Sequence, residues 1–144
     1  MRAVGFAIKK GELWFSVIDG TTKQDATIVA TGKHLFQTNC TGEDLSLNFY
    51  NMFSEIISQY NPSSIACKVH LNSSLEQIPY MHCPLGLLMY ICKIKNVPVT
   101  MRSGSWITAG KKKKIQLCQE HFSDEKLSAE KLTAVLVAWY QFGD

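Results

Sequence analysis

The sequence has no acidic residues in its most apolar segments. Twelve Asp and Glu residues are spread over 144 positions, yet none falls in the strand-like run 2–8, the second such run 65–69 or the apolar helical stretch 132–142. Carboxylates are the side chains that hold hard divalent cations. We therefore expect no metal-dependent chemistry to be built from these three segments.

The chain also lacks cysteine pairs at metal-binding spacing and long apolar runs. None of its five cysteines forms a CxxC pair, and Cys67 lies inside an apolar run, so we predict reduced thiols in a cytoplasmic protein. The nearest approach to a zinc site, His82-Cys83 with His70, is interpreted as loop and core residues. The longest apolar stretch, 135–140, is far shorter than the ~20 residues of a membrane span. We expect no secretory leader, no membrane partner and no cofactor.

The overall composition is that of a folded globular protein. Hydrophobic residues make up 46% and charged residues 19% of the chain, which excludes an intrinsically disordered protein. A chain of this length buries roughly 70% of its unfolded surface, and we predict a single domain over residues 1–144. The net charge of +3 says little about a polyanionic partner unless the cations are clustered.

Three strand-like runs at the start of the chain predict an antiparallel meander. They cover residues 2–8, 13–18 and 27–30, with a continuation over 33–36. Apolar residues then recur at three- and four-residue spacing between 49 and 60, which predicts an amphipathic helix. We expect Thr41 or Asp44 to cap this helix and Asn61-Pro62 to end it.

The second half of the chain alternates strands and helices. The run 65–69 is expected to lie parallel to the first strand through a right-handed crossover. A helix is predicted over 85–95, a strand over 97–101, and two helices over 115–122 and 127–142. The complete order is three strands, a helix, a strand, a helix, a strand and two helices.

Four short motifs accompany this order. They are Val4-Gly5-Phe6-Ala7, Ser64-Ile65-Ala66-Cys67-Lys68-Val69, the basic stretch 101–111 and the closing stretch 129–140. They resemble, in turn, an apolar-Gly-apolar-Asp strand, a strand ending in a catalytic Glu, a Pro-Ser-x-Trp/Val-Lys segment with a Gly/Lys-rich turn, and a helix in which Asp precedes a small, apolar run.

In this combination the chain resembles the ribonuclease H-like superfamily, in its RuvC-type Holliday-junction resolvase branch. The resemblance extends over nearly the whole chain as an order of elements. It implies an α/β fold with a mixed five-stranded sheet, an antiparallel meander followed by parallel strands, and helices on both faces.

The same resemblance implies a nuclease site whose carboxylates are missing. Enzymes of this family use three or four carboxylates to hold two divalent cations. Carried over by motif, the first Asp falls on Ala7, the strand Glu on Lys68 (or Val69 if the register slips by one), and the helix Asp on Lys131 or its neighbour Glu130. We therefore predict no catalytic residue and no bound metal at these positions.

The basic stretch allows two interpretations. Arg102 and Lys111-Lys112-Lys113-Lys114 place five cations in thirteen residues, with Trp106 among them. In the first interpretation, these residues form a ridge that contacts phosphates, and the ring of Trp106 stacks on a base. Alternatively they form a solvated loop that runs into a helix, with Trp106 as a core anchor.

Lys68 also has two interpretations. If Lys68 ends a central strand beside the former metal site, its ammonium group, with Lys131 nearby, replaces the metals and holds a phosphate without cutting it. In the other interpretation Lys68 extends to the rim of the sheet or pairs with a carboxylate such as Glu130.

Three functional hypotheses follow. The first is a catalytically silent RuvC-like domain that binds the phosphates of DNA or RNA. Its predicted contact residues are Lys68, Arg102, Trp106, Lys111, Lys112, Lys113, Lys114 and Lys131. The second is a protein-interaction or structural domain, homodimeric in one version, with no ligand at the degenerate site. The third is a metal-dependent nuclease with relocated acids.

Overall fold

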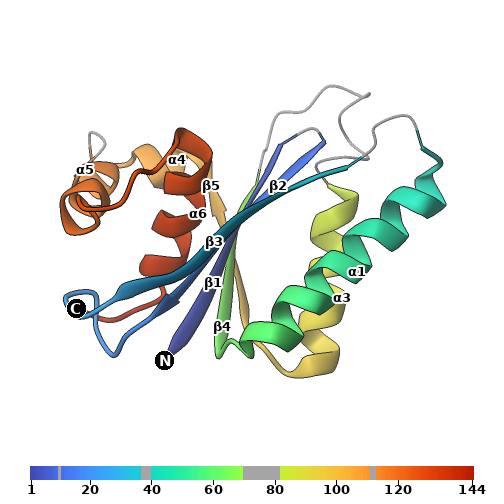
Figure 1. The fold of residues 1–144 in the computed structure, drawn as a ribbon, viewed down its shortest axis with the longest axis horizontal. Coiled ribbons are helices and arrows are strands. Elements are labelled where there is room, and N and C mark those ends of the chain that lie inside the picture. Colours follow the sequence, from blue (N-terminus) through green and yellow to red (C-terminus); the bar gives the residue numbers. More distant parts are fainter. Residues whose placement is uncertain (10, 37–39, 70–81, 111–112) are drawn as a thin grey trace.

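The computed structural model describes residues 1–9, 11–36, 40–69, 82–110 and 113–144. It has five strands, β1 (Arg2–Lys9), β2 (Glu12–Asp19), β3 (Thr27–Leu35), β4 (Ser64–Val69) and β5 (Val99–Ser103). Its described helices are α1 (Gly42–Tyr60), α3 (Cys83–Lys95), α4 (Gly104–Thr108), α5 (Lys113–His121) and α6 (Ala129–Trp139). Helices α1 and α3 cover one face of the sheet, and α4, α5 and α6 lie on the other (Figure 1).

The strands form one mixed sheet in the order β3-β2-β1-β4-β5. β1 pairs antiparallel with β2, which pairs antiparallel with β3, whereas β1, β4 and β5 are parallel. The predicted meander followed by parallel strands is therefore confirmed. β1 lies at the centre because the crossover through α1 places β4 on the free side of β1.

Each face of the sheet has its own apolar core. On one face, the predicted stripe of α1 buries Phe49, Phe53 and Ile56 against the strands. On the other face, α6 lies directly on β1. A Cβ atom added at Gly5 would lie 1.9 Å from the backbone oxygen of Ala134, so only glycine allows this close approach.

Local signals in the sequence explain most of the element boundaries. The hydroxyl of Thr41 accepts a hydrogen bond from the Asp44 amide (3.2 Å), which makes Thr41 the N-cap of α1. Asn61 ends the helix in the left-handed conformation, as expected for this position. The final helix begins only at Ala129, because Ser128 caps it.

The final helix, expected over 127–142, ends at Trp139, and two differences from the sequence prediction lie between α3 and α5. The strand expected over 97–101 occupies Val99–Ser103. It is followed at once by the short helix α4, which was not predicted. The Ser103 hydroxyl caps this helix by accepting from the Trp106 amide (3.2 Å). Five residues are too few to show helical periodicity, so only the cap marks this helix in the sequence.

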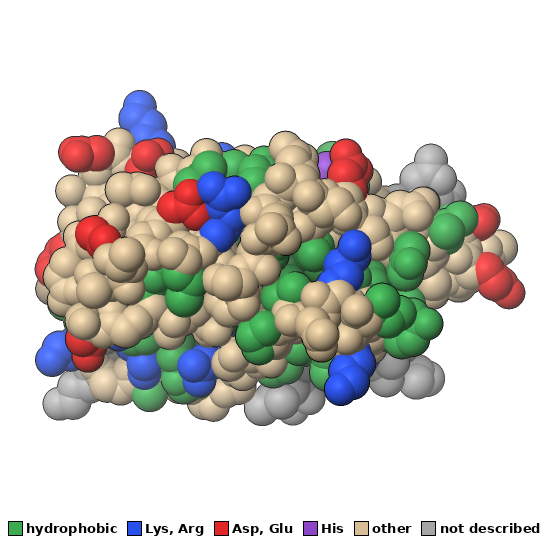
Figure 2. Space-filling view, turned by 90° about the horizontal axis from the view of Figure 1, so that it is seen from below, with side chains coloured by type: hydrophobic (Ala, Val, Ile, Leu, Met, Phe, Trp, Pro, Cys, Tyr) green, Lys and Arg blue, Asp and Glu red, His purple; other side chains and the backbone are tan. Residues whose placement is uncertain are grey.

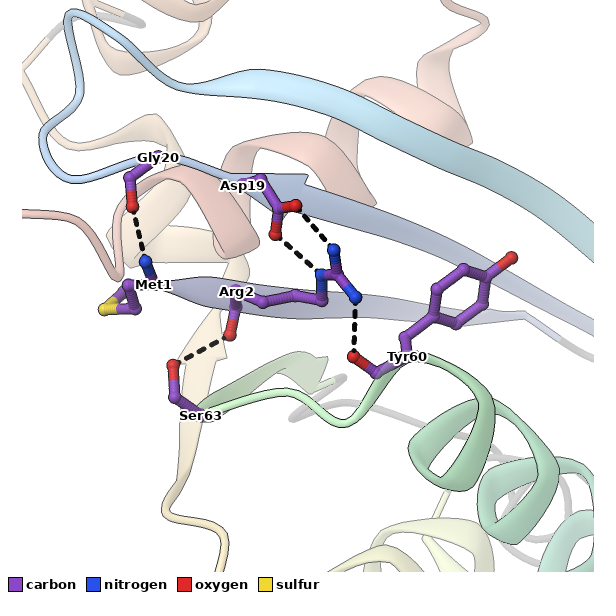
Figure 3. A network of polar contacts seen from close by, with 6 residues as sticks. All are labelled: Met1, Arg2, Asp19, Gly20, Tyr60 and Ser63. Atoms are coloured by element: carbon purple, nitrogen blue, oxygen red, sulfur yellow. Dashed lines mark hydrogen bonds and ion pairs between the residues drawn. The ribbon is translucent and has the colours of Figure 1, made fainter.

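A polar network closes the end of the sheet where β1 begins (Figure 3). The Arg2 guanidinium donates to both carboxylate oxygens of Asp19 (2.7 and 2.6 Å) and to the Tyr60 carbonyl (3.0 Å). Ser63 donates to the Arg2 carbonyl (3.0 Å). These contacts join β1, β2 and the end of α1, at the opposite end of β1 from Ala7.

None of the helices in the described part of the chain has the length and apolar character needed to cross a bilayer.

Candidate functional site

The sheet register aligns five residues in one row across all five strands. Lys33 of β3 pairs with Trp14 of β2, Trp14 with Ala7 of β1, Ala7 with Lys68 of β4, and Lys68 with Arg102 of β5. Paired residues point to the same face of a sheet. We call these five residues the cationic row. It spans about 19 Å at the usual strand spacing.

The cationic row lies on the face covered by α6. The next row toward the start of β1 contains Gly5, which contacts α6 directly. Side chains two residues apart in a strand share a face, so Ala7 points to the same side as Gly5. Ala7 and Lys68 also lie at the carboxyl ends of two parallel strands, the edge at which open α/β sheets bind their ligands.

A pocket of about 150 Å³ opens where α6 begins above this row. It is lined by Ala7, Ile8, Lys9 and Lys68 from the strands and by Ala129, Glu130 and Thr133 from α6. The structure therefore brings Ala7 and Lys68 together, as their motifs predicted. From the helix, Glu130 reaches the pocket, whereas its neighbour Lys131 is half-exposed and is not one of the lining residues.

The charges in the pocket are only partly paired. Lys9 donates a hydrogen bond to the Glu130 carboxylate, and this bond is the main cause that lowers the pKa of Glu130 and raises the pKa of Lys9. The charge of Lys33 lowers the pKa of Glu130 further. Lys68 is half-buried, and its ammonium group makes no hydrogen bond or ion pair with any residue that the structure describes.

The two interpretations of Lys68 can now be compared with the contacts. Glu130 is the carboxylate nearest to Lys68 among the lining residues, yet it bonds to Lys9. The pairing of Lys68 with Glu130 is therefore not formed. An ammonium group that is half-buried and has no counter-ion within the described part of the chain attracts anionic ligands.

The pocket does not fit a pair of divalent cations. Its described lining holds one carboxylate, Glu130, together with the ammonium groups of Lys9 and Lys68. An ammonium group has no lone pair with which to bind a metal. Across the described residues, no three His, Cys, Asp or Glu side chains lie close enough together to hold a metal ion.

The other acids considered as replacement ligands lie elsewhere or are already engaged, as far as the structure describes them. Asp19 binds Arg2 at the far end of β1, and Glu12 accepts from Trp14 (3.0 Å). Asp124 and Glu125 are exposed ahead of α6. Glu76 lies outside the described residues.

Trp106 forms the centre of a basic cluster at the β5 end of the row. The Arg102 guanidinium lies 4.3 Å and the Lys114 ammonium 4.8 Å from the centroid of its ring. Lys114 also donates to the Trp106 carbonyl (3.0 Å), and the ring meets Tyr140 edge-on at 5.3 Å. Trp106 is thus half-buried against the core below α6 while it holds two cations.

Of the other lysines predicted in the basic stretch, Lys113 alone falls within the described residues. Lys113 is exposed at the start of α5, and Lys111 and Lys112 lie outside the described residues. Lys9, Lys33 and Trp14 were not predicted as site residues. Alternation along β1 places Lys9 on the same face as Ala7, but the position of Lys33 depends on strand register, which local patterns do not provide.

Solved structures with a similar fold include Holliday junction resolvases. The chain is similar to RuvC of Thermus thermophilus with a TM-score of 0.79 and 13% identity, over 96% of this chain and 92% of that one. For T. thermophilus RuvC in complex with a Holliday junction substrate, the TM-score is 0.81 and the identity 14%, over 98% of this chain and 94% of that one. For the yeast mitochondrial Holliday junction resolvase, the TM-score is 0.68 and the identity 8%, over 95% of this chain and 77% of that one.

No protein-family model and no curated protein matches the sequence. At these low identities the structural likeness establishes the fold alone. The chain has the ribonuclease H-like α/β fold in its RuvC-type form, as the sequence predicted.

Proposed function

We propose that this chain is a catalytically silent RuvC-like domain that binds the phosphates of nucleic acid through the α6 face without cleaving them. The observation that carries the proposal is Lys68: a half-buried ammonium group without a counter-ion among the described residues, at the carboxyl edge of the parallel strands. In a nuclease of this fold the motif would supply a carboxylate there.

The surroundings of Lys68 support the same function. Arg102 lies beside Lys68 in the sheet and carries no ion pair in the described part of the structure. Arg102 and Lys114 both lie over the ring of Trp106. Lysine and arginine that lack acidic partners bind phosphate oxygens and release the counter-ions of the nucleic acid. One of the similar structures, T. thermophilus RuvC, is bound to a Holliday junction, so a branched duplex is the first ligand to try.

The absence of cleavage is proposed from the composition of the pocket. Two-metal hydrolysis requires several oxygen ligands around the cations. Ala7 provides none, Lys68 repels cations, and Glu130 is bound to Lys9.

We also propose that residues 1–144 act as one domain and that the protein works in the cytoplasm.

The direct test measures binding by fluorescence anisotropy. A four-way DNA junction, a plain duplex and a single strand, each also prepared as RNA where the shape allows, are titrated at low and moderate salt. We expect affinity that falls steeply with salt, and no cleavage with Mg²⁺ or Mn²⁺. Absence of binding to every ligand at low salt would contradict the proposal, and so would metal-dependent cleavage.

Lys68→Glu is the decisive variant, and Lys93→Glu is its matched control. Lys93 is exposed on α3, on the opposite face of the sheet, and its substitution changes the net charge by the same amount. We expect Lys68→Glu to weaken binding by at least about tenfold, since it loses one phosphate contact and adds a repulsive charge. The control should change affinity by less than about threefold.

A second candidate function is favoured by apolar side chains on the other face. Tyr90 and Ile94 of α3 are 60% and 62% exposed, and Leu47, Tyr50 and Met89 are also exposed on these two helices, α1 and α3. Hydrophobic side chains also gather in the right half of Figure 2, where α1 and α3 lie. Contiguous exposed apolar surface is typical of protein interfaces.

This second candidate is a protein-interaction domain or a homodimer. Sedimentation equilibrium over a range of concentrations tests the homodimer. A dimer that dissociates in Ile94→Glu would support it, and a monomer at all concentrations would exclude it. The two candidates use opposite faces of the sheet, so Ile94→Glu should leave nucleic-acid binding unchanged unless dimerisation is required for it.

A further inference from the structure

We propose that the nucleic-acid backbone crosses the strands along the cationic row, and that Lys33 on Trp14 is a second phosphate-binding position. This inference rests on the proposed function and extends it. The site residues predicted from the sequence lie in β1, β4, β5 and the helical region after β5, and none of them lies in β2 or β3. The register adds a position on β3 at the far end of the same row.

The row is open to solvent at the places where it carries charge. Lys33 is exposed, and Lys68 and Arg102 are half-buried, whereas Ala7 between them is buried at the floor of the pocket. β1 contributes a cation through Lys9, two residues further along the strand on the same face. Every strand but β2 therefore has a basic residue at this edge, of which Lys9 is paired with Glu130, and β2 presents Trp14.

Lys33 and Trp14 repeat the arrangement found around Trp106. The Lys33 ammonium lies 4.8 Å from the centroid of the Trp14 ring, the same distance as Lys114 from the Trp106 ring. The Trp14 indole is fixed in turn by its hydrogen bond to Glu12. A ring face holds an ammonium group in place without using its N–H donors, so these donors are available for a phosphate.

The ion pair between Lys33 and Glu12 does not use up this capacity. The two groups are 3.8 Å apart, which is longer than a hydrogen bond, and their side chains are 38% and 31% exposed. Surface pairs of this kind contribute little to stability, because solvent screens them. A phosphate that approaches Lys33 therefore loses little to competition from Glu12.

The spacing indicates how much nucleic acid the row contacts. Three strand gaps separate Lys33 from Lys68, which corresponds to about 14 Å. Duplex nucleic acid places one phosphate of each strand per ~3.4 Å of helix axis, so this distance covers about four nucleotides. Because cations lie over the rings of both tryptophans, we infer that the row contacts the backbone and that base stacking contributes little.

The salt dependence of binding tests the second position. With a short duplex, the slope of log Kobs against log salt concentration is measured for the wild type, Lys33→Gln, Lys68→Gln and Lys93→Gln. Each lost phosphate contact should reduce the slope by about one and weaken binding about eightfold at ~0.1 M salt. Lys33→Gln and Lys68→Gln should each show this loss, and Lys93→Gln should not.

A second variant separates a phosphate contact from a general charge effect. Glu12→Gln removes the neighbouring acid and should tighten binding, and Lys33→Gln in the same chain should abolish that gain. Glu43→Gln, an exposed acid at the start of α1, is the control for the overall charge. Thermal melting of each variant by circular dichroism establishes that it is folded.

The outcomes distinguish this inference from the function on which it rests. If Lys68→Gln lowers the slope while Lys33→Gln behaves like Lys93→Gln, the second position is wrong and the proposed function stands. If the wild type binds none of the junction, duplex and single-stranded ligands at low salt, both are wrong. If Lys33→Gln lowers the slope and cancels the effect of Glu12→Gln, the second position is established.

Discussion

Ala7 and Lys68 are register partners on two adjacent parallel strands, and both line the pocket below the start of α6. This pairing places a methyl group and an ammonium group side by side at the carboxyl edge of the sheet. Glu130 approaches from the helix but is bound to Lys9. The electrostatics of the pocket therefore favour an anion over a cation.

Restoring carboxylates should convert the pocket into a metal site. In Ala7→Asp/Lys68→Glu, two new carboxylates join Glu130, which provides enough oxygen ligands for a hard divalent cation. We expect Mn²⁺ to raise the melting temperature of this variant, by an amount that corresponds to about 2.7 kcal/mol at a hundredfold excess over Kd. Differential scanning fluorimetry with and without EDTA measures the shift.

The controls for the restored site are the wild type and Lys93→Glu. Neither should be stabilised by Mn²⁺, because neither gains ligands in the pocket. Stabilisation of the wild type by the metal would show that the pocket already binds cations, and the silent-site proposal would then be wrong. The double variant should also lose nucleic-acid binding, since it lacks Lys68.

The fold was predictable because each large element carries its own signal. Short apolar runs rich in β-branched and aromatic residues marked the strands, and the stripe from Phe49 to Tyr60 marked α1. Ala7 and Lys68 were predicted as neighbours because short motifs placed each at the end of a strand. The sequence placed the helix residue of the site at Lys131 or its neighbour Glu130, and the structure puts Glu130 rather than Lys131 into the pocket.

The β2–β3 half of the site could not be predicted in this way. A one-residue slip in register moves every side chain of a strand to the opposite face. The register of β3 against β2 shifts between Val17 and Ile18, so that Ile28 packs toward α6 whereas Ala30 packs toward α1. Alternation counted from the start of β3 therefore places Lys33 on the wrong face.

Gly5→Ala should strongly destabilise the protein. The new Cβ would lie 1.9 Å from the Ala134 oxygen and 2.9 Å from the Ala138 Cβ, so α6 would have to move away from β1. Overpacking of this kind costs about 1–3 kcal/mol or more. Urea unfolding followed by tryptophan fluorescence measures the loss.

Gly86→Ala provides the matched control. Gly86 is exposed on α3, and in the described structure a Cβ at this position meets nothing within 4 Å. Alanine should stabilise the helix by about 0.5–1 kcal/mol. If both variants were equally stable, α6 would not lie against β1 as closely as described.

The cysteines should differ sharply in reactivity. Burial raises the pKa of Cys67 to about 12, that of Cys118 to about 12 and that of Cys92 to about 11, so their reactive thiolates are scarce at pH 8. Cys83 is exposed in the first turn of α3. We expect N-ethylmaleimide to modify Cys83 rapidly and the three buried thiols only after denaturation.

Mass spectrometry of peptides after timed labelling measures this order of reactivity. The same reaction in denaturant is the control, since all thiols should then react at similar rates. Rapid labelling of Cys67 in the folded protein would show that the core between β4 and α3 opens readily.

Asp19→Asn should make stability less dependent on acid pH. The hydrogen bonds from Arg2 lower the pKa of Asp19 below its ordinary 3.8. The contribution of Asp19 is therefore fully present above that ordinary value, and it is lost as the pH falls through the lower value of the folded protein. Both side chains are 37% exposed, so the variant should lose at most about 1 kcal/mol at pH 7.

The measurement compares urea unfolding of the wild type and Asp19→Asn at pH 7 and at about pH 2, where the ordinary carboxyl is protonated. Other carboxylates titrate in both proteins, so their effects cancel in the difference. That difference should shrink toward zero in acid, because protonation weakens the pair with Arg2 in the wild type. Asp124→Asn, at an exposed position ahead of α6, should match the wild type at both pH values. A difference between wild type and Asp19→Asn that stays constant or grows in acid would mean that Arg2 does not hold Asp19 in the ionised form.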